Sequence, residues 1–307
     1  MNTDPRHVAE RLAGIYGHGV DSPPTYPTWV AFLGRLGLDG GDADVVADIV
    51  RLVEPLLAKP DALPGTPHSL ATACFADQLF AATGDSRYRD FLVHQANRFV
   101  PDPDCRVEDF FFAGSLLGRA HAVTGETSYR DRLLGFLRSA DTRQRNGLYW
   151  HCRASPYFWG RGNAFAALGF AQALSHLGTA GTEALAATHE EHLRALADHQ
   201  DDSGLWRQII DDPSTYLEHS ATTMVGVAIA QGLRGGWLSD ARWGHVLERA
   251  WTGAAVRIGA RGELDQVCVG TGPLDCREAY VERPFSTGAD SRGGAMALWF
   301  AVEMSQR

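Results

Sequence analysis

Two adjacent carboxylates, Glu108 and Asp109, stand directly before three phenylalanines and are the first residues whose types and spacing could do chemistry. A carboxyl group among aromatic rings is partly desolvated, which raises its pKa and lets it hold a proton near neutral pH. The same acidic pair is also typical of a core helix's first turn, where the helix dipole favours negative charge. Neighbours on a helix point in different directions, so one carboxyl could face a cavity while the other caps or pairs. Both readings stay open, and the residues do not choose between Glu108 and Asp109.

A second candidate segment, Ser155–Leu174, joins a polar and aromatic cluster to an apolar run at helical spacing, which predicts a buried or half-buried helix. Trp159, Arg161 and the glycines Gly160 and Gly162 stand just before that run. Aromatic rings stack on sugar faces, and arginine binds carboxylate or hydroxyl groups through two hydrogen bonds. Glycine lets a backbone approach a ligand closely. The alternative is a core helix in which Trp159 packs and Arg161 pairs with a carboxylate.

Three weaker motifs complete the chemical candidates. Without other evidence, His151 is more typical of a core or surface histidine whose ring nitrogens are hydrogen-bonded within the protein than of a functional histidine. Glu218–Ser220 contains the three residue types of a catalytic triad, an acid, a base and a nucleophile. Adjacent residues cannot adopt the geometry of a triad, so we expect this segment to cap the following helix. Gly270–Gly272 is a GxG without the third glycine or the parallel α/β pattern of a dinucleotide fold. These glycines favour close-approach loops at one end of a helical toroid.

The elements that must position these residues are helices joined by short polar turns. The pattern at Thr83–Asp90 is repeated 41 residues later at Thr124–Asp131. In each copy an apolar helix ends at a glycine, Gly84 or Gly125, and a second helix begins with a tyrosine expected to face inward. A repeated helical hairpin of this size predicts a toroid or solenoid of helix pairs.

About 11 or 12 helices are expected, with few strands. Helices are predicted over His7–Tyr16, Trp29–Leu36, Ala43–Leu57, Ser69–Ala82, Ser155–Leu174, Thr182–His199, Ser220–Leu233, Ala241–Ile258 and Ser291–Glu303, with another beginning near Ser86. Trp206–Ile210 and Val267–Val269 are expected as small strands. Because no interior linker or low-complexity segment occurs, residues 1–307 are expected to form a single domain, with an N-terminal helix and loop over residues 1–20.

Composition excludes several functional classes. The chain has 307 residues, 45% of them hydrophobic and 21% charged, as in an ordinary soluble globular protein. A net charge of −9 argues against nucleic-acid and anionic-membrane partners.

No apolar stretch is long enough to span a membrane, and the N-terminus lacks an apolar signal region. Five scattered cysteines without a CxxC pair favour reduced thiols in the cytoplasm. Oligomeric state is left open.

In their order and spacing, five segments together resemble the unsaturated rhamnogalacturonyl hydrolases and unsaturated glucuronyl hydrolases of glycoside hydrolase families 105 and 88. These segments are Val107–Gly114, Gly147–His151, Phe158–Asn163, Gly204–Ser220 and Val267–Gly294. The resemblance runs from about Tyr26 to Glu303. It implies an all-α fold, an (α/α)6 barrel of six helical hairpins.

The resemblance also implies roles for single residues. Alignment on Phe112–Gly114 puts Glu108 at the position of the family's aspartate proton donor, with Asp109 beside it; a slip of one residue would make Asp109 the donor. Where the family has a tryptophan, this chain has Arg106, and where it has a second aspartate, this chain has His68.

The remaining matches are substrate contacts. His151 matches the family's Gly-Leu-(Phe/Tyr)-x-His pattern, and Trp159, Arg161 and Asn163 match a segment where the family contacts substrate. With His68, these are the substrate-binding residues that the resemblance implies. Arg161 is then the natural partner for a substrate carboxylate.

The implied substrates are saccharides ending in a 4,5-unsaturated uronic acid. The enzyme protonates the vinyl ether at C4, water adds at C5, and the hemiketal collapses to release the next sugar. One carboxyl serves as acid and then as base, and no metal or organic cofactor is needed. The departures at Arg106 and His68 keep two alternatives open. One is the same barrel used as a biosynthetic lyase, hydratase or isomerase on a sugar-like or natural-product substrate. The other is a non-catalytic sugar-binding barrel.

Overall fold

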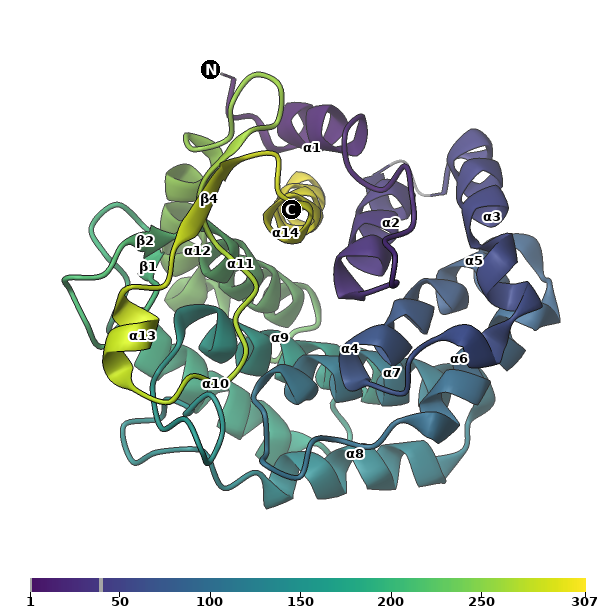
Figure 1. Ribbon diagram of the computed structural model, residues 1–307, viewed down its shortest axis with the longest axis horizontal. Coiled ribbons are helices and arrows are strands. Elements are labelled where there is room, and N and C mark those ends of the chain that lie inside the picture. The colour runs from purple at the N-terminus through teal and green to yellow at the C-terminus, as the bar shows by residue number, and fades with distance from the viewer. Residues whose placement is uncertain (1, 39–40) are drawn as a thin grey trace.

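Five helices are buried along nearly their whole length, because their sequences are apolar or small on every side. They are α2 (Tyr26–Leu38), α7 (Glu108–Thr124), α9 (Gly160–Leu177), α11 (His219–Arg234) and α14 (Ser291–Ser305). A sixth central segment is broken into α4 (Pro67–Leu70), the 3₁₀ turn η2 (Ala71–Phe75) and α5 (Ala76–Thr83). In the computed structural model, which describes residues 2–38 and 41–307, these elements form a closed ring in the order α2, η2, α7, α9, α11, α14 and back to α2 (Figure 1).

The other long helices form an outer layer and bury one face each. They are α1 (Pro5–Ala13), α3 (Ala43–Ala58), α6 (Ser86–Arg98), α8 (Thr127–Ser139), α10 (Glu183–Ala197) and α12 (Asp240–Ala255). Each of α3, α6, α8, α10 and α12 packs on the ring helix that precedes it in the chain, and α1 packs on α14 (Figure 1). The described residues thus form six helix pairs, which confirms the (α/α)6 barrel of six hairpins.

The repeated turn has the predicted geometry in both copies. Gly84 and Gly125 end α5 and α7 in the left-handed region, with φ of 71° and 73°. Such a φ favours glycine because a side chain there would be strained. Tyr88 and Tyr129, which follow these turns, are buried as expected.

Two predicted helices differ from the structure. The helix expected over Ser69–Ala82 is interrupted by η2 and so is divided into α4 and α5. The helix expected from Ser155 begins only at Gly160, because the residue before it, Trp159, is extended and forms a bridge with Ile209.

Short strands and turns cover one end of the ring. The strands are β1 (Trp206–Arg207), β2 (Leu217–Glu218), β3 (Leu264–Cys268) and β4 (Phe285–Gly288), paired β1–β2 and β3–β4 in antiparallel fashion. The short helix α13 (Arg277–Val281) joins β3 to β4, and the turn η1 (Pro60–Ala62) follows α3. Within the described ranges, no helix has the length and apolar character needed to cross a membrane.

Candidate active site

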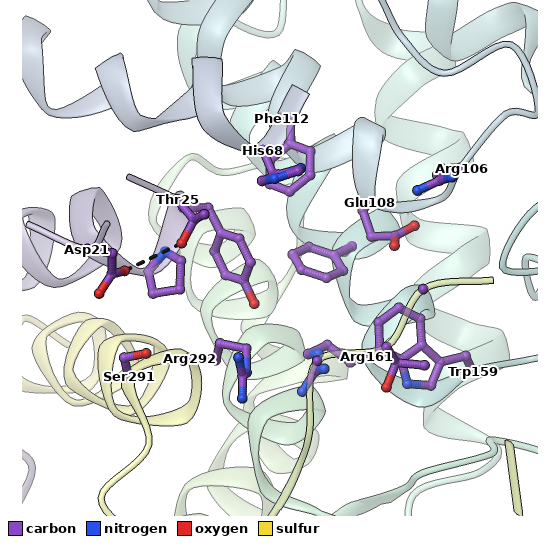
Figure 2. Close-up of a pocket in the computed structure, with 16 residues that line it drawn as sticks. Asp21, Thr25, His68, Arg106, Glu108, Phe112, Trp159, Arg161, Ser291 and Arg292 are labelled. Carbon is purple, nitrogen blue, oxygen red and sulfur yellow. Dashed lines mark hydrogen bonds between the residues drawn. The ribbon is translucent and has the colours of Figure 1, made fainter. Parts of the chain in front are cut away.

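A cavity of about 500 Å³ lies where the first turns of several ring helices meet. Its walls come from α2, α4, α7, α9 and α14 and from the loop after β3 (Figure 2). The lining residues are Asp21, Thr25, Tyr26, Pro27, His68, Arg106, Glu108, Phe112, Trp159, Arg161, Phe165, Gly270, Thr271, Gly272, Ser291 and Arg292. Because helix N-termini carry partial positive charge, this end of the ring favours an anionic ligand.

Two glycines bring α7 and α9 together and so set the distance between the cavity walls. A Cβ added to Gly114 would lie 2.4 Å from the carbonyl oxygen of Gly169, and one added to Gly169 would lie 2.4 Å from the backbone of Phe110. No side chain fits either space. The close packing places the first turn of α7, with Glu108, beside the start of α9, with Trp159 and Arg161.

Glu108 opens α7 and presents its carboxyl group to the cavity (Figure 2). Its Oε1 lies 3.0 Å from Nε2 of His151, while Oε2 has no hydrogen-bond partner among the described residues. Buried polar atoms without a partner are rare in native proteins. One oxygen is therefore held in place, and the other is uncommitted.

His151 lies behind Glu108 and is fully buried, so it is not part of the cavity wall. Its Nδ1 lies 2.5 Å from the hydroxyl of Tyr280, which also accepts a hydrogen bond from the backbone N–H of Leu274 at 3.2 Å. The His151 ring thus joins two side chains, with Nδ1 facing the hydroxyl of Tyr280 and Nε2 facing the carboxyl group of Glu108. The histidine expected to bind substrate instead orients the acid.

The pKa values of the two adjacent acids are shifted in opposite directions. Burial raises the pKa of Glu108, but the charge and hydrogen bond of His151 outweigh it, so the pKa of Glu108 is lowered overall. Burial raises the pKa of Asp109 to about 7. Asp109 is 2% exposed, is not part of the cavity wall, and accepts a hydrogen bond from the backbone N–H of Asp102 at 2.6 Å. The raised pKa expected for an acid among phenylalanines therefore belongs to Asp109 and not to the acid in the cavity.

Arg161 lies on the wall opposite Glu108, but most of its donors are already used (Figure 2). Nη1 donates to the carbonyl of Cys268 at 2.5 Å and to Oγ of Ser220 at 3.3 Å, and Nη2 donates to the carbonyl of Val269 at 2.7 Å. The guanidinium also lies over the ring of Trp159, 5.0 Å from its centroid. Both Nη atoms of Arg161 thus fix the strand and loop that close the cavity, whereas its buried Nε has no hydrogen-bond partner among the described residues.

Trp159 and Asn163 are also held by protein contacts. The ring of Trp159 lies at the cavity wall and packs on His151 at a centroid distance of 4.6 Å. The side-chain amide of Asn163 is fully buried away from the cavity and makes three hydrogen bonds, to the backbone N–H and carbonyl of Tyr149 and to the carbonyl of Trp159. Asn163 therefore joins two backbone segments behind the wall, although the family resemblance implied a substrate contact.

The two glycines before α9 serve protein packing and not ligand approach. A Cβ on Gly160 would lie 2.2 Å from the carbonyl oxygen of Arg207, and one on Gly162 would lie 2.9 Å from the side chains of Trp159 and Val107. Neither glycine is part of the cavity wall. The close approach expected at these positions is thus between backbone segments of the protein itself.

Among the lining residues that were not expected from the sequence, Arg292 and Tyr26 have uncommitted hydrogen-bond donors. Nη2 of Arg292 lies 3.2 Å from Oδ2 of Asp290, and Nη1 has no hydrogen-bond partner in the described part of the chain. The hydroxyl of Tyr26 likewise has no such partner, and burial raises its pKa, so it stays protonated. The signal for Arg292 was its place at the start of a helix capped by Asp290, but nothing in the sequence placed it in the same cavity as Glu108.

His68 lies in the cavity wall, as expected, on the same side as Glu108 (Figure 2). Burial is the main cause that lowers its pKa, so His68 is neutral at neutral pH. Asp21 is the other carboxylate of the lining, and it accepts hydrogen bonds from Thr25 and Thr28 at the far end of the cavity from Glu108. Glu218 caps α11 by accepting from the backbone N–H groups of Ser220 and Ala221, which confirms capping over a triad.

A metal site is not evident in this arrangement. Across residues 2–38 and 41–307, no group of three or more His, Cys, Asp or Glu side chains could hold a metal ion.

Comparisons with known proteins agree with the fold and with the family resemblance. A family profile described as Glycosyl Hydrolase Family 88 matches residues 107–307. The unsaturated rhamnogalacturonyl hydrolase YesR of Bacillus subtilis (strain 168) is 25% identical over 259 residues, which cover 74% of this chain and 73% of that protein. The unsaturated 3S-rhamnoglycuronyl hydrolase of Alteromonas sp. (strain LOR) is 27% identical over 139 residues, 44% of this chain and 33% of that protein.

Solved structures share the architecture over the whole chain. A possible member of the GH105 family from Klebsiella pneumoniae subsp. pneumoniae MGH 78578 has a TM-score of 0.87 at 20% identity and covers 100% of this chain and 94% of its own. A glycosyl hydrolase family 88 protein from Bacteroides vulgatus has a TM-score of 0.81 at 15% identity, with coverages of 100% and 99%. At these identities the likeness establishes the fold alone.

Proposed function

The chain belongs to glycosyl hydrolase family 88 and is a hydrolase, and we propose that it hydrates the terminal 4,5-unsaturated uronyl group of a saccharide and so releases the next sugar. The reaction consumes one water. A proton is added at C4 and the water oxygen at C5. The resulting hemiketal opens to a C5 ketone and leaves a hemiacetal at C1, which collapses to an aldehyde and frees the sugar that was linked to C1. The curated relatives named above support this substrate class by what their names state.

The observation that carries the proposal is the state of the Glu108 carboxyl group. Glu108 lines the cavity, its Oε1 is held by His151, and its Oε2 is buried without a hydrogen-bond partner among the described residues. A hydrolase that uses two carboxylates needs a second one at a set distance from the first. The other lining carboxylate, Asp21, is engaged by two threonines at the far end of the cavity. The arrangement favours a mechanism with one carboxyl group, which we assign to Glu108.

The substrate itself helps to supply the proton that C4 requires. In the free protein Glu108 is ionised, because His151 lowers its pKa. An anionic substrate beside Glu108 excludes water and adds a like charge, and both raise the pKa of this carboxyl. Glu108 can then take up a proton, deliver it to C4, and as carboxylate accept a proton from the water that attacks C5.

We assign the uronate carboxylate to Arg292, across the cavity from Glu108, and to Tyr26, whose hydroxyl interacts electrostatically with Arg292. Both residues have hydrogen-bond donors that no other described residue uses, whereas Arg161 is committed to backbone carbonyls. A charge-assisted bond to Arg292 and a hydroxyl bond to Tyr26 would hold the vinyl ether between the two walls. We assign His68, which also lines the cavity, to a contact with a sugar hydroxyl. Membership of a hydrolase family makes the lyase, isomerase and pure binding alternatives less favourable.

Domain and location also remain proposals. We propose that residues 1–307 act as one domain, since α1 packs on α14 and α2 and completes the outer layer. We propose the cytoplasm as the location, which the five free cysteines support, four of them buried.

The test is to incubate purified protein with a 4,5-unsaturated uronyl disaccharide in D₂O. We expect the ultraviolet absorbance of the conjugated double bond to disappear, an equal amount of the second sugar to be released, and deuterium to appear at C4 of the keto acid by NMR. If a panel of unsaturated uronides stays intact, the proposed function is wrong.

A further inference from the structure

A second cavity, which we call the far-end cavity, lies at the end of the ring opposite the candidate active site. Its volume is about 290 Å³, and residues from α2, α5, α7, α9, α11 and α14 line it. On all of these helices except α5, the lining residues lie in the second half of the helix. The candidate active site is instead lined from the first two turns of α2, α7, α9 and α14. The two cavities therefore open at opposite ends of the same ring.

A chain of buried polar side chains runs along the wall of the far-end cavity. Nη1 of Arg119 on α7 donates to Oε1 of Gln172 on α9 at 2.7 Å, and Nε2 of Gln172 donates to Oε1 of Gln231 on α11 at 2.8 Å. Nε2 of Gln231 donates to Oε1 of Glu303 on α14 at 3.0 Å. All four residues are buried and line the cavity. Their mutual bonds offset the cost of burying them and hold amide and charged groups in place at the wall.

The charges around the far-end cavity are balanced. Arg119 pairs with Asp77 at 3.1 Å, and Glu303 pairs with Arg234. Burial, and after it the charge of Arg119, hold the pKa of the lining residue His176 well below its ordinary value, so His176 is neutral. The C-terminal ends of the ring helices add partial negative charge. This end of the ring therefore does not favour an anion, unlike the candidate active site.

Two polar residues of the lining are not committed to the protein. Oε1 of Gln78 is buried and has no hydrogen-bond partner among the described residues. No hydrogen bond joins the ring of His176 to any residue that the structure describes, and a neutral imidazole offers one donor and one acceptor. Trp299 and Val302, one turn apart on α14, add apolar surface to the same cavity. Apolar surface with a few fixed polar groups is typical of small-molecule sites.

From these observations we propose that the far-end cavity binds an uncharged, polyhydroxylated molecule of the size of one monosaccharide. Its hydroxyl groups would donate to Gln78 and pair with His176, and its less polar face would lie on Trp299 and Val302. Sites for drug-sized ligands begin at about 300 Å³, so a cavity of about 290 Å³ suits one sugar ring. The inference goes beyond the proposed function and does not depend on it.

The experiment titrates the full-length protein with glucose, galactose and rhamnose and follows the sugar signals by NMR. We expect at least one of them to saturate a single site with a Kd of roughly 1 mM, the range for a ligand of about twelve heavy atoms. Gln78→Leu and His176→Phe should each weaken binding by about tenfold or more. Neither change breaks a hydrogen bond between described residues, so thermal stability and turnover should stay near wild type.

The matched control is Glu108→Gln, which alters the other cavity and should leave the Kd of the sugar unchanged. Failure of all three sugars to bind at about 100 mM would overturn the inference. It would also be overturned if Glu108→Gln abolished binding, or if Gln78→Leu and His176→Phe both bound like wild type. Should the two variants fold poorly, crystals of the wild-type protein soaked in the three sugars decide. Density in the far-end cavity supports the inference, and its absence there contradicts it.

Discussion

Oε1 of Glu108 and Nε2 of His151 lie 3.0 Å apart, although 43 residues separate them in the chain. The contact forms because α7 begins at Glu108 and the backbone N–H of Val107, just before it, donates to the carbonyl of His151 at 2.9 Å. A backbone bond and a side-chain bond thus join the same two segments. This double connection fixes which carboxyl of the acidic pair faces the cavity.

Tyr280→Phe tests whether His151 acts through its orientation. The change removes the hydroxyl that lies 2.5 Å from Nδ1 of His151, so the ring loses the contact that sets its proton arrangement. We expect kcat to fall roughly 10- to 100-fold with little change in KM, and the pH profile of kcat to shift. The matched control is Tyr157→Phe, whose ring packs on Tyr280 at 5.2 Å but whose hydroxyl bonds to no described residue. Equal kinetics in the two variants would contradict the positioning role.

Asp109→Asn tests the electrostatics of the buried acid. The pKa of Asp109 is raised from 3.8 to about 7 by burial, so the folded state keeps a proton that the unfolded chain loses. The free energy of unfolding of the wild type should therefore fall as pH rises from about 4 to about 7. Asparagine cannot ionise and still accepts from Asp102, so the variant should lack this fall. At pH 8 we expect it to be more stable by on the order of 3 kcal/mol.

Urea unfolding at pH 4.5 and pH 8 measures this difference. At pH 4.5 the difference should shrink to about 1 kcal/mol, because Asp109 is protonated in the folded state and the pH lies less than one unit above the ordinary pKa of 3.8. The same pH dependence in wild type and variant would show that Asp109 is not buried as a neutral acid.

Gly169→Ala tests the close packing of α7 on α9. The added Cβ would lie 2.4 Å from the backbone of Phe110, and a shift of the backbone to relieve this contact would cost free energy. We expect a loss of stability of roughly 1–3 kcal/mol or more and lower kcat, because Glu108 shifts relative to Trp159. Gly135→Ala is the control: Gly135 is an exposed position of α8 with open space around it. That change should stabilise by roughly 0.5–1 kcal/mol. Equal stability of the two variants would contradict the packing argument.

Arg292→Gln and Arg161→Gln should affect different quantities. Arg292 is 33% exposed and has an uncommitted Nη1, so its loss should raise KM roughly tenfold with little change in stability. Arg161 is 2% exposed and donates to the carbonyls of Cys268 and Val269. Its loss should lower the free energy of unfolding by several kcal/mol, since buried carbonyls lose their donors. Kinetics and thermal unfolding of both variants check this, and the reverse pattern would return the substrate carboxylate to Arg161.

Part of this molecule is predictable from local sequence. The repeated turn at Gly84 and Gly125 predicts helix pairs, because a left-handed glycine and the tyrosine after it are local signals. Apolar character on all sides of α7 and α9 places both helices inside. The rotation of α7 that turns Glu108 toward the cavity and Asp109 away depends on contacts between distant parts of the chain. These are the two bonds to His151 and the close packing at Gly114 and Gly169, which no local pattern predicts.

The partners of the site residues are the least predictable part. Tyr280 lies 129 residues after His151, and the carbonyls bound by Arg161 lie 107 and 108 residues after it. Because those contacts are made by the end of β3, the residue after it and α13, their existence depends on how the last third of the chain folds back over the ring. Sequence reasoning therefore found Arg161 but assigned its donors to a substrate.

The most direct test compares Glu108→Gln with Asp109→Asn on one 4,5-unsaturated uronyl disaccharide, measured as the initial rate of ultraviolet absorbance loss. We predict that Glu108→Gln lowers kcat by about a thousandfold or more while the protein stays folded, because glutamine cannot carry the proton. Asp109→Asn should stay within a few fold of wild type. Full activity in Glu108→Gln, or loss of activity only in Asp109→Asn, would contradict the assignment of the acid to Glu108.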